Sequence, residues 1–90
     1  ASVRNALVAS ESSLKERLER DDLRTRYESL SERQRDTMRF LIRGLSNKEI
    51  GQELGISPRT VEIHRTWVMT KMNARSIADL VRMSMALGID

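Results

Sequence analysis

The segment from Ser46 to Met72 contains two helix-start signals separated by a glycine, and this pattern constrains the fold more than any other feature. Ser46 and Glu49 have capping-box spacing, in which the serine hydroxyl and the glutamate carboxylate each accept from the other residue's backbone N–H. Ser57 is a second N-cap, and it is followed by a proline. Proline has no backbone N–H, but at the first position of a helix that N–H would have no partner inside the helix anyway. Gly55 can adopt the left-handed conformation that ends a helix. A short helix, a tight turn and a longer helix form a helix-turn-helix, whose second helix usually lies in the DNA major groove.

Positive charge is concentrated around this motif. The chain of 90 residues has a formal net charge of +3 and a pI of about 10.0. Residues 31–75 hold nine basic and five acidic residues, whereas residues 1–30 hold six of each and residues 76–90 hold one basic and two acidic. A phosphate-binding surface requires such an excess, although many solvated helical faces are similarly basic.

Several classes of protein are excluded by what the sequence lacks. Cysteine is absent, so there is no disulfide or thiolate metal site, which fits a reducing compartment and an expected cytoplasmic location. No apolar run approaches the roughly 20 residues of a membrane span, and no signal peptide is visible. The one histidine, His64, has no catalytic partner at a recognisable spacing, and there is no glycine-rich phosphate loop or metal-ligand cluster. We expect no enzyme, no metal or other cofactor and no membrane contact. Because the chain does not begin with Met, we also expect a piece of a longer protein.

The first third of the chain is polar and has a helical pattern. The residues of its one apolar seam, which Ser10 interrupts, are Val3, Leu7, Leu14 and Leu18. One interpretation is a solvent-exposed linker helix. The other is a short coiled coil that pairs two chains, although about three to four heptads are usually needed for one. Asp21 and Asp22 are expected to break or restart the helix. We predict a helical linker over residues 1–29 and a helix-turn-helix domain over residues 30–90.

The other helices are delimited by their own start and stop residues. Ser31 begins another capping box, and the helix after it is expected to end before Gly44. A last helix begins after Ser76 and ends near Gly88. Gly51 faces the core, where its missing side chain is expected to permit a close helix crossing. The apolar residues expected inside are Met38, Leu41, Ile42, Ile50, Leu54, Ile77, Leu80 and Val81. The predicted fold is therefore all-α, a four-helix body preceded by the helical linker.

The second helix of the motif has two contrasting faces when its residues are placed at about 100° intervals. Val61, Val68 and Met72 fall together and are expected to point into the core. The opposite face would meet base edges in a major groove, and its predicted base-contacting residues are Arg59, Glu62, Ile63, Thr66 and Thr70. Arginine suits guanine, isoleucine suits a thymine methyl group, and threonine can hydrogen-bond to several bases. Glutamate can accept from a cytosine amino group and repels misplaced phosphates.

One flank of this helix carries groups able to donate to phosphate, namely those of Thr60, His64, Trp67 and Lys71. For His64 the alternative is a half-buried, hydrogen-bonded core position, which we favour. For Trp67 packing across a helix junction is equally open. The first helix of such a motif crosses the DNA backbone, so Ser46, Asn47 and Lys48 at its start are further phosphate candidates. Ser57 is another, although capping alone would explain Ser57 and Thr60, and Lys48 fits a solvated surface position equally well.

Four segments of the chain form a specific combination. They are Leu30-Ser31-Glu32-Arg33-Gln34, Gly44 to Ile50, Ile56 to His64, and Val68 to Met72. Together they resemble the LuxR/FixJ-type DNA-binding domain. The run from Ser57 to Arg65, together with Leu80-Val81-Arg82, makes the chain look most like the FixJ subgroup. The resemblance implies the C-terminal effector domain of a bacterial two-component response regulator, in a phosphorelay. An N-terminal receiver domain would then precede residues 1–29 in the full-length protein.

The resemblance also implies how the domain binds DNA. Members bind double-stranded DNA as a homodimer on a dyad-symmetric site, with the dimer contact on the last helix, which corresponds by position to Ala78, Arg82 and Met85. The family's phosphate-contacting threonine and lysine match Thr60 and Lys71, and its base-contacting positions match Glu62, Ile63 and Thr66. Some relatives carry lysines at the first and third of these positions, so their base preference does not carry over to this chain.

Two other functions fit parts of the pattern. The promoter-reading domain of a sigma factor has a similar helix-turn-helix and would bind core RNA polymerase before promoter DNA, and RNA polymerase is also a candidate partner of a regulator. A helical protein-interaction module would bind a partner helix through the seam in residues 1–18. The linker-like first helix and the spare apolar stripe of the last helix favour the regulator.

Overall fold

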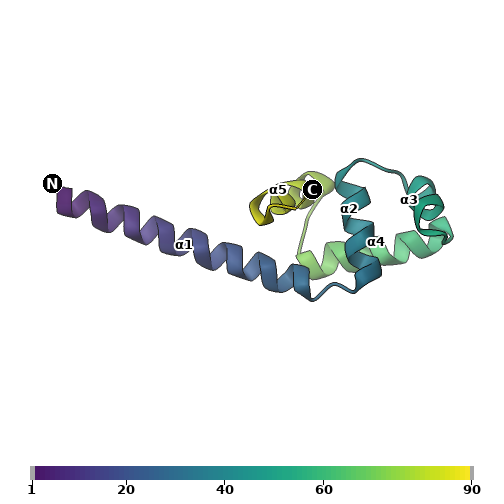
Figure 1. Ribbon diagram of the computed structural model, residues 1–90, viewed down its shortest axis with the longest axis horizontal. Helices are drawn as coiled ribbons and strands as arrows, with labels where there is room; N and C mark the ends of the chain where they lie inside the picture. Colours follow the sequence, from purple (N-terminus) through teal and green to yellow (C-terminus); the bar gives the residue numbers. More distant parts are fainter. Residues whose placement is uncertain (1, 90) are drawn as a thin grey trace.

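The computed structural model describes the backbone of residues 2–89 and the side chains of residues 14–89. Over residues 2–89 the regular secondary structure is all α-helix, without strands. The helices are α1 (Ser2–Glu28), α2 (Glu32–Ile42), α3 (Asn47–Leu54), α4 (Pro58–Met72) and α5 (Ile77–Leu87). Helices α2 to α5 form the body of the molecule, and α1 projects from it as a long arm (Figure 1). The predicted all-α fold, with a four-helix body and a helical extension, is confirmed.

The helix starts are set by local hydrogen bonds. The Ser31 hydroxyl accepts from the Gln34 N–H at 3.2 Å, and the Gln34 Oε1 accepts from the Ser31 N–H at 2.9 Å, so the capping box of α2 is complete. Ser46 and Glu49 make the same pair of bonds at the start of α3, at 3.2 and 3.0 Å. Each box satisfies N–H groups that have no partner inside the helix, which is why the bounds of these helices could be predicted.

The turn between α3 and α4 depends on two glycines. Gly55 ends α3 with φ 69°, the left-handed conformation expected of it. Gly51 is buried inside α3, and a Cβ placed on it would lie 2.6 Å from the Ile56 carbonyl oxygen. The close approach expected at Gly51 is therefore present. Its nearest atom is in the turn, and the Pro58 nitrogen at the start of α4 would lie 3.5 Å from the same Cβ.

The core lies between α2, α4 and α5, with α3 and the end of α1 covering its sides. Its buried apolar side chains are Leu30, Met38, Leu41, Ile50, Val61, Val68, Met72, Leu80 and Met83. Of the residues expected inside, Ile42, Leu54, Ile77 and Val81 are only half-buried. Thr37 is fully buried, and its hydroxyl donates to the Arg33 carbonyl oxygen at 2.9 Å, so its polar group has a partner within α2.

Helix α1 runs without interruption through Asp21 and Asp22, so the expected break there is wrong. Asp22 forms an ion pair with Arg26 one turn later, with 2.7 Å between Oδ2 and Nη2, and pairs at this spacing stabilise a helix. Leu23 and Tyr27 pack against the core from the same part of α1. Tertiary packing and the ion pair thus outweigh the weak preference of two aspartates for a helix end.

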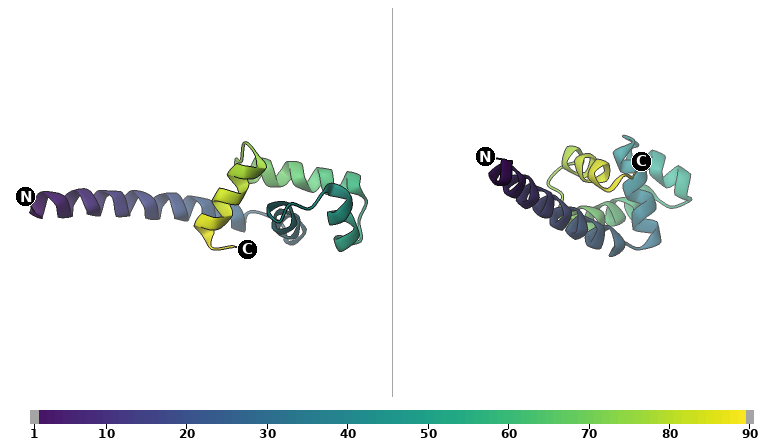
Figure 2. Two further views of the ribbon diagram at one scale, coloured as in Figure 1. Left: turned by 90° about the horizontal axis from the view of Figure 1, so that it is seen from above. Right: turned by 60° about the vertical axis from the view of Figure 1, so that its left-hand side comes forward.

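The seam predicted along α1 is described only in part. Val3 and Leu7 lie outside the residues whose side chains the structure describes. Leu14 and Leu18 are both exposed, 53% and 61% respectively. Figure 2 shows the N-terminal part of α1 projecting away from the other helices while its C-terminal part passes beside α5. The two leucines therefore point into solvent in the isolated chain, which fits both interpretations of the seam.

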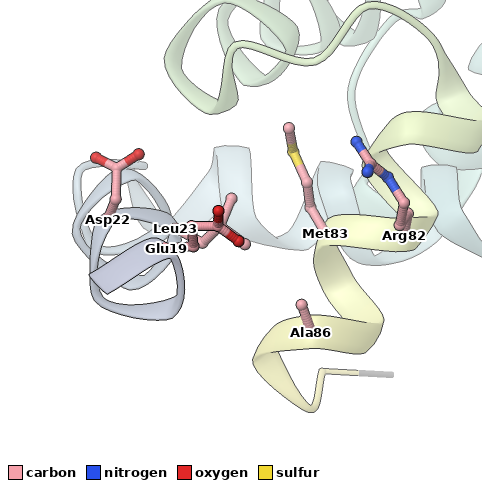
Figure 3. Close-up of a pocket in the computed structure, with 6 residues that line it drawn as sticks. All are labelled: Glu19, Asp22, Leu23, Arg82, Met83 and Ala86. Carbon is pink, nitrogen blue, oxygen red and sulfur yellow. The ribbon is translucent and has the colours of Figure 1, made fainter. Parts of the chain in front are cut away.

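A groove lies between the end of α1 and α5 (Figure 3). The residues that line it are Glu19, Asp22, Leu23, Arg82, Met83 and Ala86. The end of α1 therefore contributes side chains to the same surface as α5. Along the part of the chain that is described, no helix combines the length and apolar character required to cross a bilayer.

Candidate nucleic-acid interface

Helix α4 is oriented by the three residues expected to point inward. Val61, Val68 and Met72 are each 0% exposed and form part of the central cluster. Because these residues lie on one side of the helix, the opposite side of α4 is left free of the core. The helix begins at Pro58 after the Ser57 cap and is packed against α2 and α3, so this free face is held on a rigid framework.

The free face of α4 presents all five residues predicted to contact bases. Arg59, Glu62, Ile63, Thr66 and Thr70 are all exposed. Four of them, all except Thr70, line one shallow depression on the surface. Ile63 is 53% exposed and lies among polar residues on this face. The structure therefore brings the predicted residues together on one accessible surface.

The hydroxyl of Thr66 is committed to its own helix as a donor. Its Oγ1 donates to the Glu62 carbonyl oxygen at 3.0 Å. The lone pairs of the same oxygen stay available, so Thr66 offers an acceptor outward. A group of this kind suits the amino groups of adenine or cytosine in the major groove.

Ser57 and Thr60 form the cap at the start of α4. The Ser57 hydroxyl oxygen accepts from the Thr60 N–H at 3.2 Å, and the two hydroxyl oxygens lie 2.9 Å apart. Ser57 is exposed and Thr60 is half-buried. The capping role is thus present, and it leaves the Ser57 side of the pair accessible to a phosphate.

The start of α3 holds the other predicted phosphate contacts. Lys48 is exposed, while Asn47 is half-buried and its Oδ1 is buried without a hydrogen-bond partner among the described residues. Hydrogen bonds from the backbone N–H and then the hydroxyl of Ser46 hold the pKa of Glu49 below its ordinary value of 4.5. The resulting carboxylate already occupies the helix terminus, so the N–H groups there are less open to a phosphate than the sequence suggested.

The flank of α4 carries an aromatic–cation pair whose lysine also bonds to α2 and to the residue after α1. The Lys71 Nζ lies 5.7 Å from the centre of the Trp67 ring, and Trp67 is 51% exposed. The same ammonium donates to the Gln34 Oε1 at 2.9 Å and to the Ser29 carbonyl oxygen at 3.2 Å. Lys71 is therefore half-buried and already bonded within the chain, whereas Trp67 faces outward.

Sequence reasoning missed the partners of Lys71, because the two hydrogen bonds join residues 37 and 42 positions apart.

His64 on the same flank is half-buried, as favoured, but its Nδ1 is buried without a hydrogen-bond partner in the described part of the chain. Only the first half of that expectation is therefore met. No group of three or more His, Asp or Glu side chains that could hold a metal ion occurs over the same residues.

The residues assigned by position to a dimer contact lie on the outer side of α5. Ala78, Arg82 and Met85 are all exposed, and Met85 is 74% exposed. Arg82 pairs with Asp79 one turn earlier, and this guanidinium, followed by the Arg75 N–H, holds the pKa of Asp79 below its ordinary value of 3.8. The stripe thus combines an apolar side chain with an ion pair, on a helix separate from the α4 face.

Comparison with known proteins gives consistent matches. The family model for bacterial regulatory proteins of the luxR family matches residues 28–84. The transcriptional regulatory protein FixJ of Bradyrhizobium diazoefficiens is 45% identical over 89 residues, which is 99% of this chain and 43% of that protein.

Two solved structures have the same arrangement of helices. The C-terminal transcriptional activator domain of FixJ from Sinorhizobium meliloti is 52% identical, with a TM-score of 0.66 over 74% of this chain and 85% of that one. The response regulator StyR is 36% identical, with a TM-score of 0.85 over 91% of this chain and 41% of that one. The chain spans less than half the length of the Bradyrhizobium diazoefficiens FixJ that it matches.

Proposed function

The chain belongs to the luxR family of bacterial regulatory proteins, and from this premise we propose that it is the effector domain of a response regulator that binds dyad-symmetric promoter DNA as a homodimer. Its family is one of DNA-binding transcription regulators and not of enzymes. The observation that carries the proposal is the exposed face of α4, where four predicted base-contacting side chains share one depression.

Base recognition is assigned to this face of α4, inserted in the major groove. Arg59 pairs with the O6 and N7 acceptors of a guanine, and Ile63 contacts a thymine methyl group. Thr66 accepts from an exocyclic amino group, because its proton is held by the Glu62 carbonyl oxygen. The Glu62 carboxylate accepts from a cytosine amino group. Thr70 extends the reading surface toward the C-terminal end of the helix.

Phosphate binding is assigned to the groups around that face. Lys48, Asn47 and Ser46 meet one strand from the start of α3, and Ser57 and Thr60 do so from the cap of α4. Trp67, which is 51% exposed, donates its indole N–H, while Lys71 has hydrogen bonds within the chain that a phosphate must share or replace.

The rest of the proposal concerns the complete protein. Ala78, Arg82 and Met85 on α5 form the dimer contact on DNA. Residues 1–29 form a helical linker that follows an N-terminal receiver domain, and the domain at 30–90 acts in the cytoplasm, where RNA polymerase is a candidate partner. The length of the curated relative, of which this chain covers 43%, leaves room for such a receiver domain.

Selection of bound duplexes from a random DNA pool tests the proposal. A dyad-symmetric consensus is expected. The logarithm of the affinity for this consensus should fall linearly with the logarithm of the salt concentration, because phosphate contacts release counterions. Saturable binding without a preferred sequence would refute the proposed regulator. Binding to core RNA polymerase before any DNA would instead indicate a sigma-factor domain, and capture of a partner helix by Leu14 and Leu18 without DNA binding would indicate an interaction module.

A further inference from the structure

The C-terminal ends of α1 and α4 lie side by side, and each receives a cation from the other helix (Figure 1). The Arg26 Nη1 on α1 donates to the Met72 carbonyl oxygen at the end of α4, at 3.2 Å. In the opposite direction, the Lys71 Nζ on α4 donates to the Ser29 carbonyl oxygen just past the end of α1, also at 3.2 Å. We call these two hydrogen bonds the reciprocal latch.

The last carbonyl groups of a helix have no partner inside it and carry the negative end of its dipole. In α4 the turn supplies two of the missing donors, since the Asn73 N–H donates to Thr70 and the Ala74 N–H donates to Met69. The Arg26 guanidinium supplies the donor for Met72. A charged donor at this position forms a stronger bond than a neutral one, so it holds the final turn of α4 firmly.

Arg26 is itself held in place by its own helix. The Asp22 Oδ2 accepts from the Nη2 of Arg26 at 2.7 Å, while the Nη1 of the same guanidinium reaches α4. The arginine side chain is 31% exposed and the Asp22 side chain is 58% exposed, so the guanidinium is the less exposed member of the pair. The planar fork of arginine serves both partners at once, which a point charge on a flexible stem would do less well.

We propose that Arg26 is a positioning residue for DNA recognition, which fixes the last turn of α4 so that Thr66 and Thr70 meet the bases in the correct register. The inference rests on the proposed DNA binding. Arg26 lies before residue 28, outside the segment that the family model matches. The linker helix is therefore part of the DNA-reading unit and not only a connection to it.

The test compares Arg26→Ala with Arg24→Ala in the complete 90-residue chain. Arg24 is on the same helix, is exposed, and has no side-chain hydrogen bond or ion pair among the residues described. Both variants therefore lose one positive charge, and only Arg26→Ala removes one of the two latch bonds. The probes are a duplex selected by the wild-type chain and a shuffled duplex of the same length, and the readout is the ratio of the two affinities.

This ratio separates positioning from stability. A smaller folded fraction lowers both affinities equally, whereas a misplaced reading face lowers only the specific one, because phosphate contacts carry little sequence information. We expect the ratio to fall about five- to tenfold in Arg26→Ala, as for the loss of part of a charged hydrogen bond, and less than about twofold in Arg24→Ala. Faster amide exchange at residues 69–72 in Arg26→Ala is expected alongside.

Each outcome decides one of the two proposals. A wild-type chain that does not prefer the selected duplex contradicts the proposed function itself. A wild-type chain that prefers it, with equal ratios in the two arginine variants, overturns the positioning role and leaves the function intact. If Arg26→Ala does not fold, Asp22→Ala takes its place with Asp21→Ala as its control. A fall in the affinity ratio for Asp22→Ala but not for Asp21→Ala, smaller than that expected for Arg26→Ala, supports the latch. Equal ratios in the two aspartate variants overturn it.

Discussion

Gly51 shows how one missing side chain sets the geometry of the helix-turn-helix. A Cβ at this position would overlap the Ile56 carbonyl oxygen, and the Ile56 N–H donates to the Gly51 carbonyl oxygen at 3.0 Å. The turn therefore folds back tightly on α3. A glycine inside a helix usually lowers stability relative to alanine. At Gly51 the missing Cβ is what permits the close approach of the turn.

The variant Gly51→Ala is expected to lower the free energy of unfolding by about 1–2 kcal/mol, because the overlap exceeds what alanine gains in helix propensity. Thermal unfolding followed by circular dichroism measures the change. Gln52→Ala, at the exposed neighbouring position, is the control and should be neutral or slightly stabilising. Equal stability of the two variants would show that the turn can move away at no cost.

The capping box at Ser46 makes part of the stability depend on pH. The pKa of Glu49 is lowered in the folded chain by its hydrogen bonds from Ser46, so the stabilisation is present above the ordinary value of 4.5 and is lost as the pH falls through the folded pKa. Glu49→Gln keeps an acceptor without the charge. We expect the wild type to melt at a higher temperature than this variant at pH 7, and the difference to shrink steadily below pH 4.5.

The control for this titration is Glu53→Gln, an exposed position at the other end of α3. The carboxylate of Glu53 lies near the C-terminal end of the helix, where negative charge is unfavourable. The melting temperature of this control should not fall relative to the wild type at pH 7. If both variants follow the same pH profile, the capping box contributes nothing specific to acid stability.

Helix α4 has two contrasting sides. Its inner side buries Val61, Val68 and Met72, and its outer side leaves Ile63 exposed among polar groups. At its C-terminal end, the ammonium of Lys71 bonds to Gln34 and Ser29, so this residue ties α4 to the α1–α2 junction. Replacing Lys71 would therefore disturb the fold as well as any phosphate contact.

Lys48 is for this reason the better residue for separating phosphate contacts from base contacts. Lys48→Ala should weaken binding to all duplexes alike and reduce the salt slope by about one. Arg59→Ala should instead relax the preference at one base pair, at a cost of about 1–3 kcal/mol. Parallel titrations with the selected and shuffled duplexes at several salt concentrations measure both. If Arg59→Ala weakens all duplexes alike, α4 is rotated in the groove from the orientation proposed.

At the scale of the whole structure the chain is elongated, with principal extents of 60 × 21 × 18 Å, and α1 is the long arm. Two exposed surfaces are available to pair two such chains. One is the outer stripe of α5 with Met85, and the other is the seam on α1 with Leu14 and Leu18. The family resemblance favours the first, and the proposed binding to a dyad-symmetric site would pair two chains through a two-fold contact.

Met85→Glu is expected to reduce the affinity for a full dyad site by about 1–2 kcal/mol while leaving the affinity for a half-site unchanged, since a charge would replace the apolar centre of the contact. Fluorescence anisotropy with full and half-site duplexes measures the two affinities. Leu18→Glu, at a residue that is 61% exposed, is the matched control. The reverse result, with only Leu18→Glu affected, would assign dimerisation to a coiled coil of the linker.

Sequence alone determined the features that depend on neighbours in the chain. The starts of α2, α3 and α4 follow from serines that bond three residues ahead, and the inward side of α4 follows from the helical period of Val61, Val68 and Met72. These interactions are complete within one or two turns, so residue order is sufficient to predict them.

Tertiary structure decided the contacts between distant positions. The bond from Arg26 to Met72 spans 46 positions, and the bond from Lys71 to Ser29 spans 42. Whether such side chains reach each other depends on how the helices pack, and that packing is a property of the assembled core that no single segment contains. The same reason explains why α1 continues through Asp21, since the packed end of the helix outweighs its local preference.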